Sequence, residues 1–254
     1  MPEWLVLTLA MLAACALVVA ITLVRNRAAS DDEDPSETPD VIEYMTMWIG
    51  VVYAIVLGLA IAGVWEARNI AQDHVRAEAQ ALYEISERVR VYPAEARDRI
   101  RDDVNTYVGH VVDTEWKTMA DEGKITERGD ELMARIRSDV TDYQPGNDFE
   151  AQAYQPLLDQ VTAASQARSS RADSLGATMP GVVWFGLIAG AVITVGMVLA
   201  LQIRRTFREL VLAGLFSALI AFLLFLIWDF DAPYSRGVTA SAEPFLNLFP
   251  GIGD

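Results

Sequence analysis

The side chains that could carry chemistry are few in this sequence and lie far apart. It has two histidines, His74 and His110, which fall on separate predicted helices. Asp113 follows His110 by about one turn, but neither histidine belongs to a recognised zinc-binding motif. The sequence also lacks a glycine-rich phosphate loop, a nucleophile elbow and a zinc-protease helix. It therefore predicts no enzyme, no metal site and no cofactor, and it favours solvated or interhelical histidines.

One cysteine and one acidic segment complete the candidates for chemistry. Cys15 is the only cysteine and lies in an apolar run, so the chain cannot form an internal disulfide. Residues 12–15 match the pattern before a lipidated cysteine, but no basic start precedes them, so a retained membrane span is favoured. Residues 30–40 are rich in carboxylates but lack the spaced ligands and central glycine of a calcium loop. This segment is predicted to be a solvated linker.

The composition limits the class of protein and its partners. The net charge is −15, and no basic stripe is present to meet a phosphate backbone, so a nucleic-acid partner is excluded. Mean hydropathy is +0.23 although 22% of the residues are charged, which shows that apolar and charged residues are segregated along the chain. A soluble globule would mix the two kinds of residue more evenly.

Four apolar runs approach or exceed the roughly 20 residues that a helix needs to cross a bilayer. They carry no charged side chain and cover residues 4–24, 44–65, 181–203 and 210–228. Each must be a helix, because lipid cannot satisfy bare backbone groups. The sequence therefore predicts an all-α, multi-pass cell-membrane protein whose first partner is the lipid bilayer.

Between the second and third runs the pattern becomes that of amphipathic helices. The first helix continues from the second span and ends at Tyr92-Pro93, and the next ends at Gly123. A third ends before Pro145, and a fourth begins at Asn147. We therefore expect residues 1–65 to form a transmembrane hairpin with a linker at 28–43. Residues 66–180 should form a helical extramembrane domain, 181–230 a second hairpin and 231–254 a C-terminal tail.

The balance of arginines between the two sides of the membrane predicts the orientation. Five arginines flank the first span and fill the turn between the third and fourth, whereas four flank the domain: Arg25, Arg27, Arg204, Arg205 and Arg208 against Arg68, Arg76, Arg168 and Arg171. Both termini and the helical domain are therefore predicted to lie outside the cytoplasm.

The spans contain no ionisable group of the kind that a proton pump or charge-coupled carrier needs. A passive pore needs no such group, because it can select ions by backbone or polar dipoles and gate by an apolar constriction. Asp229 and Asp231 follow the last span, where they are either part of a helix-terminating turn or a ring that attracts cations at a pore mouth. Gly186 and Gly190 form a GxxxG pair, which is typical of close helix packing.

Several of these features together resemble a bacterial family of bestrophin-like proteins. They are the paired spans, the run from Glu78 to Leu82, and the terminal motif Asp231, Pro233, Tyr234 and Gly237. The resemblance implies a homo-oligomeric anion channel whose pathway is lined by the second span. Bestrophins place their helical domain in the cytoplasm, against the arginine balance.

Two hypotheses from different classes follow from these features. The first is a homo-oligomeric ion channel, with candidate pore-lining or gate residues Trp48, Val52, Ile55 and Leu59 on the second span. Its permeant partners would be inorganic ions. The alternative is a membrane-anchored sensor or scaffold whose helical domain binds a ligand or partner and which has no pore.

Overall fold

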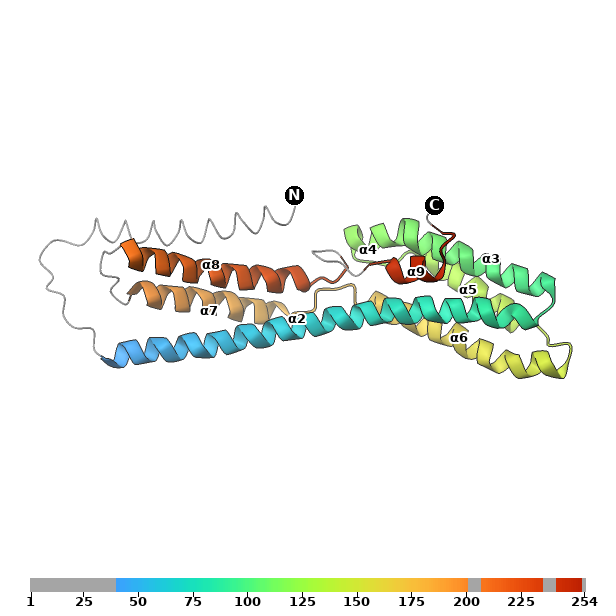
Figure 1. Cartoon of the computed structure of the whole chain (residues 1–254), viewed down its shortest axis with the longest axis horizontal. Coiled ribbons are helices and arrows are strands. Elements are labelled where there is room, and N and C mark those ends of the chain that lie inside the picture. Colours follow the sequence, from blue (N-terminus) through green and yellow to red (C-terminus); the bar gives the residue numbers. More distant parts are fainter. Residues whose placement is uncertain (1–39, 201–206, 235–240, 253–254) are drawn as a thin grey trace, which may run out of the picture. The chain divides into compact units, whose positions relative to one another are not determined.

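The computed structural model describes residues 40–200, 207–234 and 241–252. Over these residues the chain forms helices and no strands, which confirms the all-α prediction (Figure 1). The chain divides into two compact units, one formed by Met1–Trp65 and Met179–Asp231 and the other by Glu66–Thr178 and Ala232–Asp254. They are called unit 1 and unit 2 below. The first predicted span, most of the linker at 28–43 and Gly237 lie outside the described residues.

Unit 1 contains the apolar helices. Its elements are the first part of α2 (Asp40–Arg88), α7 (Gly181–Ala200) and α8 (Phe207–Phe230). In the described part of the chain these three helices are long and apolar enough to cross a membrane. They correspond to the second, third and fourth predicted spans, and the chain is accordingly a membrane protein.

Within unit 1, α2 packs on α7 and α8 along a narrow stripe. Tyr53, Leu57 and Val64 are buried there, and the hydroxyl of Tyr53 donates a hydrogen bond to the Leu187 carbonyl at 2.9 Å. A Cβ at Gly190 would lie 2.6 Å from the Tyr53 ring, so only glycine permits this approach. The second glycine of the GxxxG pair therefore packs against an aromatic ring of α2 rather than against another glycine.

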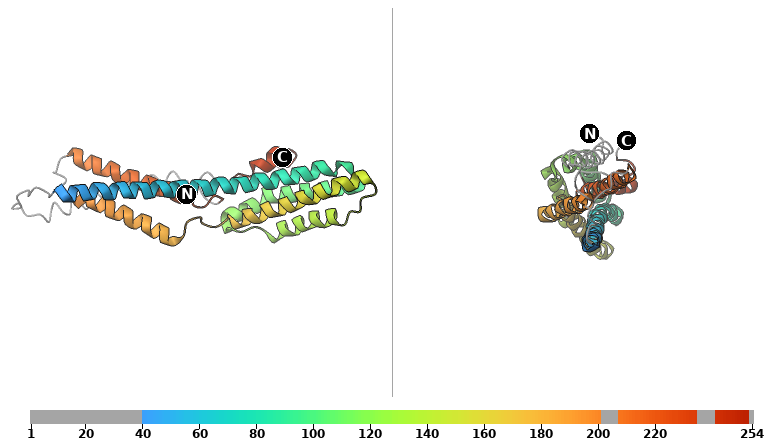
Figure 2. Two further views of the ribbon diagram at one scale, coloured as in Figure 1. Left: turned by 90° about the horizontal axis from the view of Figure 1, so that it is seen from below. Right: turned by 90° about the vertical axis from the view of Figure 1, so that its left-hand side faces the viewer.

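Unit 2 is a bundle of helices that run side by side (Figures 1 and 2). It contains the rest of α2, the 3₁₀ turn η1 (Val89–Val91), α3 (Ala94–His110), the π-helical segment η2 (Val111–Glu115) and α4 (Trp116–Glu122). After these come α5 (Glu127–Thr141), α6 (Asp148–Asp173) and, near the C-terminus, α9 (Glu243–Leu248). α2 is unbroken from Asp40 to Arg88, which confirms the predicted continuation of the second span's helix.

The ends of these helices follow from local chemistry. Tyr92 is extended, with φ −86° and ψ 159°, because the proline that follows disfavours the helical conformation. Gly123 takes the left-handed conformation with φ +66° and closes α4, as predicted. The side chain of Asn147 accepts a hydrogen bond from the Glu150 backbone N–H at 3.0 Å, which confirms the predicted cap of α6.

The C-terminal segment packs into the core of unit 2. Phe245 is completely buried, and the ring of Phe249 contacts that of Tyr83 edge-on at 6.3 Å between centroids. Ile252 lies 3.8 Å from the position that a Cβ would take at Gly109. α9 therefore covers the helical bundle with aromatic side chains.

Candidate functional site

A charged residue interrupts the apolar stripe on the second part of α2. Ala71, Val75, Leu82 and Ile85 are buried at helical spacing, and Glu78 occupies the position between Val75 and Leu82 on the same face. Glu78 is also completely buried. The helical period alone therefore delivers a carboxylate into the interior of unit 2, where it requires a cationic partner.

α6 supplies the cations by the same rule. Its buried face contains Leu157, Val161 and Ala164, and the next positions on that face are Arg168 and Arg171. Arg171 is completely buried and Arg168 is 3% exposed. Both guanidinium groups therefore lie among apolar side chains and need carboxylates within reach.

The second carboxylate, Glu115, ends the π-helical segment η2 between α3 and α4. A π-helical turn holds one extra residue and shifts the register of the residues that follow. Val111 and Glu115, the two ends of this segment, are both completely buried. Glu115 stands four residues after Val111 and four before the buried Met119, so it lies on the same inward face, which contacts α6.

Arg171 binds both glutamates. Its Nε lies 2.7 Å from Glu78 Oε2, and its Nη2 lies 3.1 Å from Glu78 Oε1 and 2.8 Å from Glu115 Oε1. Its Nη1 contacts the sulfur of Met119 at 2.7 Å. One guanidinium therefore ties α2 to η2 through two carboxylates.

Arg168 forms a two-pronged ion pair with Glu115. Its Nη1 lies 2.6 Å from Oε1 and its Nη2 lies 3.0 Å from Oε2, the fork geometry that suits a carboxylate. Its Nε donates to Asp130 at 3.0 Å, and the Asp130 side chain is 61% exposed. The pair thus extends from the interior of unit 2 to its surface.

Tyr107 and Thr126 complete the hydrogen bonds of these charges. The Tyr107 hydroxyl donates to Glu78 Oε1 and accepts from Arg168 Nη1, the latter at 3.0 Å. Glu115 Oε2 accepts from the Thr126 hydroxyl at 2.7 Å and from the Thr126 backbone N–H at 3.0 Å. We call Glu78, Tyr107, Glu115, Arg168 and Arg171 the buried ion-pair network.

His110 reaches the edge of this network. Its Nε2 lies 2.7 Å from the Thr126 hydroxyl oxygen, which itself donates to Glu115. This assigns the Nε2–H tautomer to a neutral His110, since the hydroxyl must accept from it. Across the described residues no three potential ligands gather as a metal site would require.

The charges of the network fix its protonation state. Burial acts to raise the pKa of Glu115, but the hydrogen bond from Arg168 and the charges of Arg171 and Arg168 outweigh it and lower the pKa to about 2. Burial, followed by the charge of Glu78, raises the pKa of Tyr107 well above its usual value. Glu115 is therefore an ionised acceptor at neutral pH, and Tyr107 remains a neutral donor.

The network has the character of a structural clamp. Two buried glutamates and two buried arginines balance one another in charge, and their remaining hydrogen bonds reach Tyr107, Thr126, Met119 and the exposed Asp130. A Cβ at Gly129 would lie 3.0 Å from Arg168 Cζ and nearer still to Glu115 Oε2 and Arg168 Nη2, so α5 also closes over it. Its physical effect is to hold α2, η2, α5 and α6 in one arrangement.

The candidate pore residues lie apart from this network, in unit 1. Their side chains are exposed, with relative accessibilities from 56% to 69% for Trp48, Val52, Ile55 and Leu59. At about 100° per residue, these four share the face of α2 opposite the stripe that packs on α7 and α8. The structure thus brings them together as one uncharged face.

The residues around the end of α8 have different surroundings. Asp229 lies in the last turn of α8, and the Oδ1 of Asp231 accepts from the Met179 backbone N–H at 2.7 Å. Its Oδ2 accepts from the indole N–H of Trp184 at 3.1 Å. Asp231 therefore ties the end of α8 to the start of α7, the contact expected of a residue in a helix-terminating turn.

Three further motif residues belong to unit 2. Leu82 and Pro233 are buried, and the buried Tyr234 donates its hydroxyl to the Ala71 carbonyl at 2.9 Å. The Tyr234 ring also meets Trp116 edge-on at 6.1 Å between centroids. These positions are held by packing and hydrogen bonds of the core.

The Bestrophin-like domain matches residues 11–245 of the sequence. The chain belongs to the bestrophin-like family. A crystal structure of a variant bacterial bestrophin homolog from Klebsiella pneumoniae has a TM-score of 0.70 at 12% identity, covering 97% of this chain and 99% of that one. A second variant gives 0.66 at 10% identity, with 98% and 99% covered. A crystal structure described as a membrane protein gives 0.65 at 10% identity, with 97% and 98% covered.

These likenesses show that this bestrophin-like chain has the fold of bacterial bestrophin homologs. Comparison with curated proteins gives no match. The resemblance inferred from the run Glu78 to Leu82 and from the terminal motif is thus confirmed at the level of the family.

Most of the network of this bestrophin-like chain escapes sequence reasoning. The sequence marks Glu78 only as a motif position, and Arg168 and Arg171 enter only the arginine balance across the membrane. The available signal was periodicity, because each of these three charges stands where its helix's apolar stripe predicts a buried side chain. Glu115 carries the same signal, because it stands four residues after Val111 and four before Met119 on the apolar stripe.

Proposed function

We propose that the chain assembles into a homo-oligomeric, bestrophin-like ion channel that passes anions. Trp48, Val52, Ile55 and Leu59 of α2 line its pathway or form its gate. Unit 2 is the extramembrane domain, and the buried ion-pair network keeps its helices in one arrangement.

The observation that carries the proposal is the family match over residues 11–245, together with a fold likeness that covers 97% of this chain. The match includes the spans as well as unit 2, so it extends to the part of the chain that a channel requires. Anion selectivity rests on the family resemblance alone.

The surface of α2 supports a pore-lining role. Tyr53, Leu57 and Val64 hold one side of the helix to α7 and α8, and within the described part of the chain no other helix covers the opposite side. In an oligomer, copies of this face can surround a common axis. The face is apolar along about three helical turns, as a constriction that gates by dewetting requires.

The absence of charge in the spans also favours a passive pathway. Residues 44–65, 181–203 and 210–228 contain no Asp, Glu, Lys or Arg, so active transport coupled to a buried ionisable group has no residue to use in these segments. Ion passage through backbone and side-chain dipoles remains available.

The proposal is tested by measuring ion currents from the purified full chain in planar bilayers. In a Cys15→Ser background, Ile55→Cys places a thiol on the proposed pathway. Leu215→Cys places one on α8, where the native leucine is 62% exposed and apolar. We expect a charged methanethiosulfonate reagent to change the current through Ile55→Cys channels and to leave Leu215→Cys channels unaffected.

Two outcomes would contradict the proposal. If wild-type protein carries no current with any anion or cation at any voltage, the channel hypothesis is wrong and the membrane-anchored sensor or scaffold is favoured. Equal sensitivity of the two cysteine variants would remove the pore-lining role of α2. Subunit number is measured on the same sample by mass photometry, and a monomer would contradict the oligomer.

A further inference from the structure

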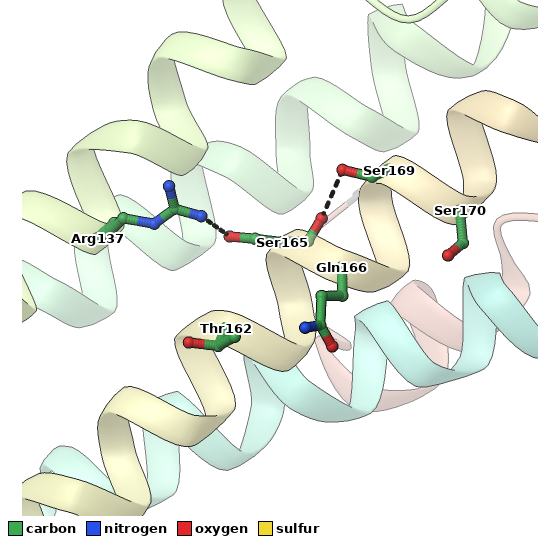
Figure 3. Close-up of a pocket in the computed structure, with 6 residues that line it drawn as sticks. All are labelled: Arg137, Thr162, Ser165, Gln166, Ser169 and Ser170. Carbon is green, nitrogen blue, oxygen red and sulfur yellow. Dashed lines mark hydrogen bonds between the residues drawn. The ribbon is translucent and has the colours of Figure 1, made fainter.

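A polar pocket opens on the surface of unit 2 between α5 and α6 (Figure 3). It has a volume of about 490 Å³ and is open to solvent. Its lining combines one arginine, four hydroxyl side chains and one amide: Arg137, Thr162, Ser165, Ser169, Ser170 and Gln166. No carboxylate lines it, although the chain as a whole carries a net charge of −15.

Arg137 differs from the other arginines of these two helices. Arg128 pairs with Glu131, Arg135 lies 3.8 Å from Asp103, and Arg168 pairs with Glu115. Arg137 has no carboxylate within 4.0 Å among the described residues. Its Nη2 instead donates to the Ser165 hydroxyl oxygen at 2.6 Å, which holds the guanidinium over the pocket.

Several hydrogen-bond donors of the pocket are still available to a ligand. The guanidinium has five N–H donors, and the described contacts of Arg137 use one of them. Ser165 accepts that bond, which leaves its own hydroxyl hydrogen to donate, and Gln166 adds an amide. Thr162 and Ser169 are already committed, because their hydroxyls donate to the Leu158 and Ser165 carbonyls at 3.0 and 3.1 Å (Figure 3). An acceptor-rich anion suits this set, whereas a cation finds no charged ligand.

We propose that this pocket binds a small oxyanion of the phosphate class, with Arg137 as its charged anchor and Ser165 and Gln166 as further donors. The planar guanidinium fork matches two oxygens of such an anion. The pocket lies wholly in unit 2, and none of its lining residues has a part in the proposed channel function. Because the pocket is open to solvent, we expect dissociation constants in the millimolar range.

The test is a titration of the full chain in detergent with inorganic phosphate. Binding is measured by isothermal titration calorimetry and by the shift in the midpoint of thermal unfolding. Ionic strength is kept constant by replacing sodium chloride. A parallel titration uses micelles that carry phosphatidic acid or phosphatidylcholine, which separates a free anion from a lipid headgroup. Arg137→Gln is compared with Arg128→Gln, an exposed arginine on the same helix.

We expect saturable binding to wild-type protein and to Arg128→Gln, and at least tenfold weaker binding to Arg137→Gln. Arg137→Lys keeps the charge but loses the two-pronged guanidinium, so its affinity for phosphate should lie between those of wild-type protein and Arg137→Gln. Saturation by phosphatidic acid micelles alone, also lost in Arg137→Gln, assigns the same chemistry to a lipid headgroup. A signal that does not saturate, or one that Arg137→Gln retains, would overturn the proposal, because it would reflect a general effect of salt on the protein's charges.

Discussion

Replacing the buried Arg171 with methionine should destabilise unit 2 more than the same replacement at an exposed arginine. The change removes the cation that binds Glu78 at 2.7 Å and Glu115 at 2.8 Å. Glu78 then keeps only the Tyr107 hydroxyl as a hydrogen-bond partner from the network, and its charge stays buried. Methionine has a similar length and is apolar, so the packing volume changes less than the charge balance.

The expected loss is about 3–5 kcal/mol, the range for removing one partner of a buried ion pair. A domain is commonly stable by only about 5–15 kcal/mol, so this is a large part of the total. The matched control is Arg76→Met, whose partner Asp73 is 67% exposed and whose own side chain is 63% exposed. Such a pair contributes at most about 1 kcal/mol.

Amide hydrogen exchange of the full chain, read by mass spectrometry over residues 66–88 and 148–173, measures the effect where it arises. A loss of about 3–5 kcal/mol corresponds to exchange that is faster by about two to three and a half orders of magnitude. Adding Glu78→Gln to Arg171→Met removes the unpaired charge, so the double variant should lose less than the sum of the single variants. Exchange that is no faster in Arg171→Met than in Arg76→Met would refute the clamp.

Asp103 gives a second prediction, because burial, followed by the hydrogen bond and charge of Asp139, raises its pKa from 3.8 to about 6. The folded protein holds that proton more tightly than the unfolded chain does. Its contribution to the free energy of unfolding is therefore fully present below pH 3.8 and is lost as the pH rises through 6. The asparagine in Asp103→Asn cannot ionise, so the substitution should raise the midpoint of thermal unfolding at pH 8, and raise it less at pH 5. The exposed Asp98→Asn should show no such gain at pH 8, and a gain equal at both pH values would exclude titration as the cause. The arginine balance predicts that unit 2 lies outside the cytoplasm, so Lys117→Cys in a Cys15→Ser background should react with an impermeant maleimide on intact cells. Labelling that requires permeabilised cells would reverse the orientation.

Much of the fold was predictable because its signals are local. The apolar runs at 44–65, 181–203 and 210–228 approach or exceed the length that a membrane span needs, and the described long apolar helices coincide with them. Gly123 and Asn147 mark helix ends through their own backbone and side-chain chemistry. Such signals need only neighbouring residues, so a single sequence contains them.

The sites were less predictable because they depend on partners that are distant in sequence. The resemblance points to the second span, and only the packing of Tyr53 on α7 shows that Trp48, Val52, Ile55 and Leu59 lie on the opposite, exposed face of that helix. The pocket at Arg137 left no sequence signal, since hydroxyl residues on a helix are ordinarily a solvated face.

By itself the sequence determined that the chain is helical and membrane-embedded, because length, hydropathy and helical period act within one segment. The bestrophin-like family was indicated separately, by the resemblance of its motifs. Tertiary structure alone decided that Glu78 meets Arg171, which is 93 residues away, and that Glu115 binds the same guanidinium. A periodic stripe fixes which residues are buried but not which helix covers them. Pairing of buried charges is therefore a property of the packed helices, and the sequence states only that a pair is required.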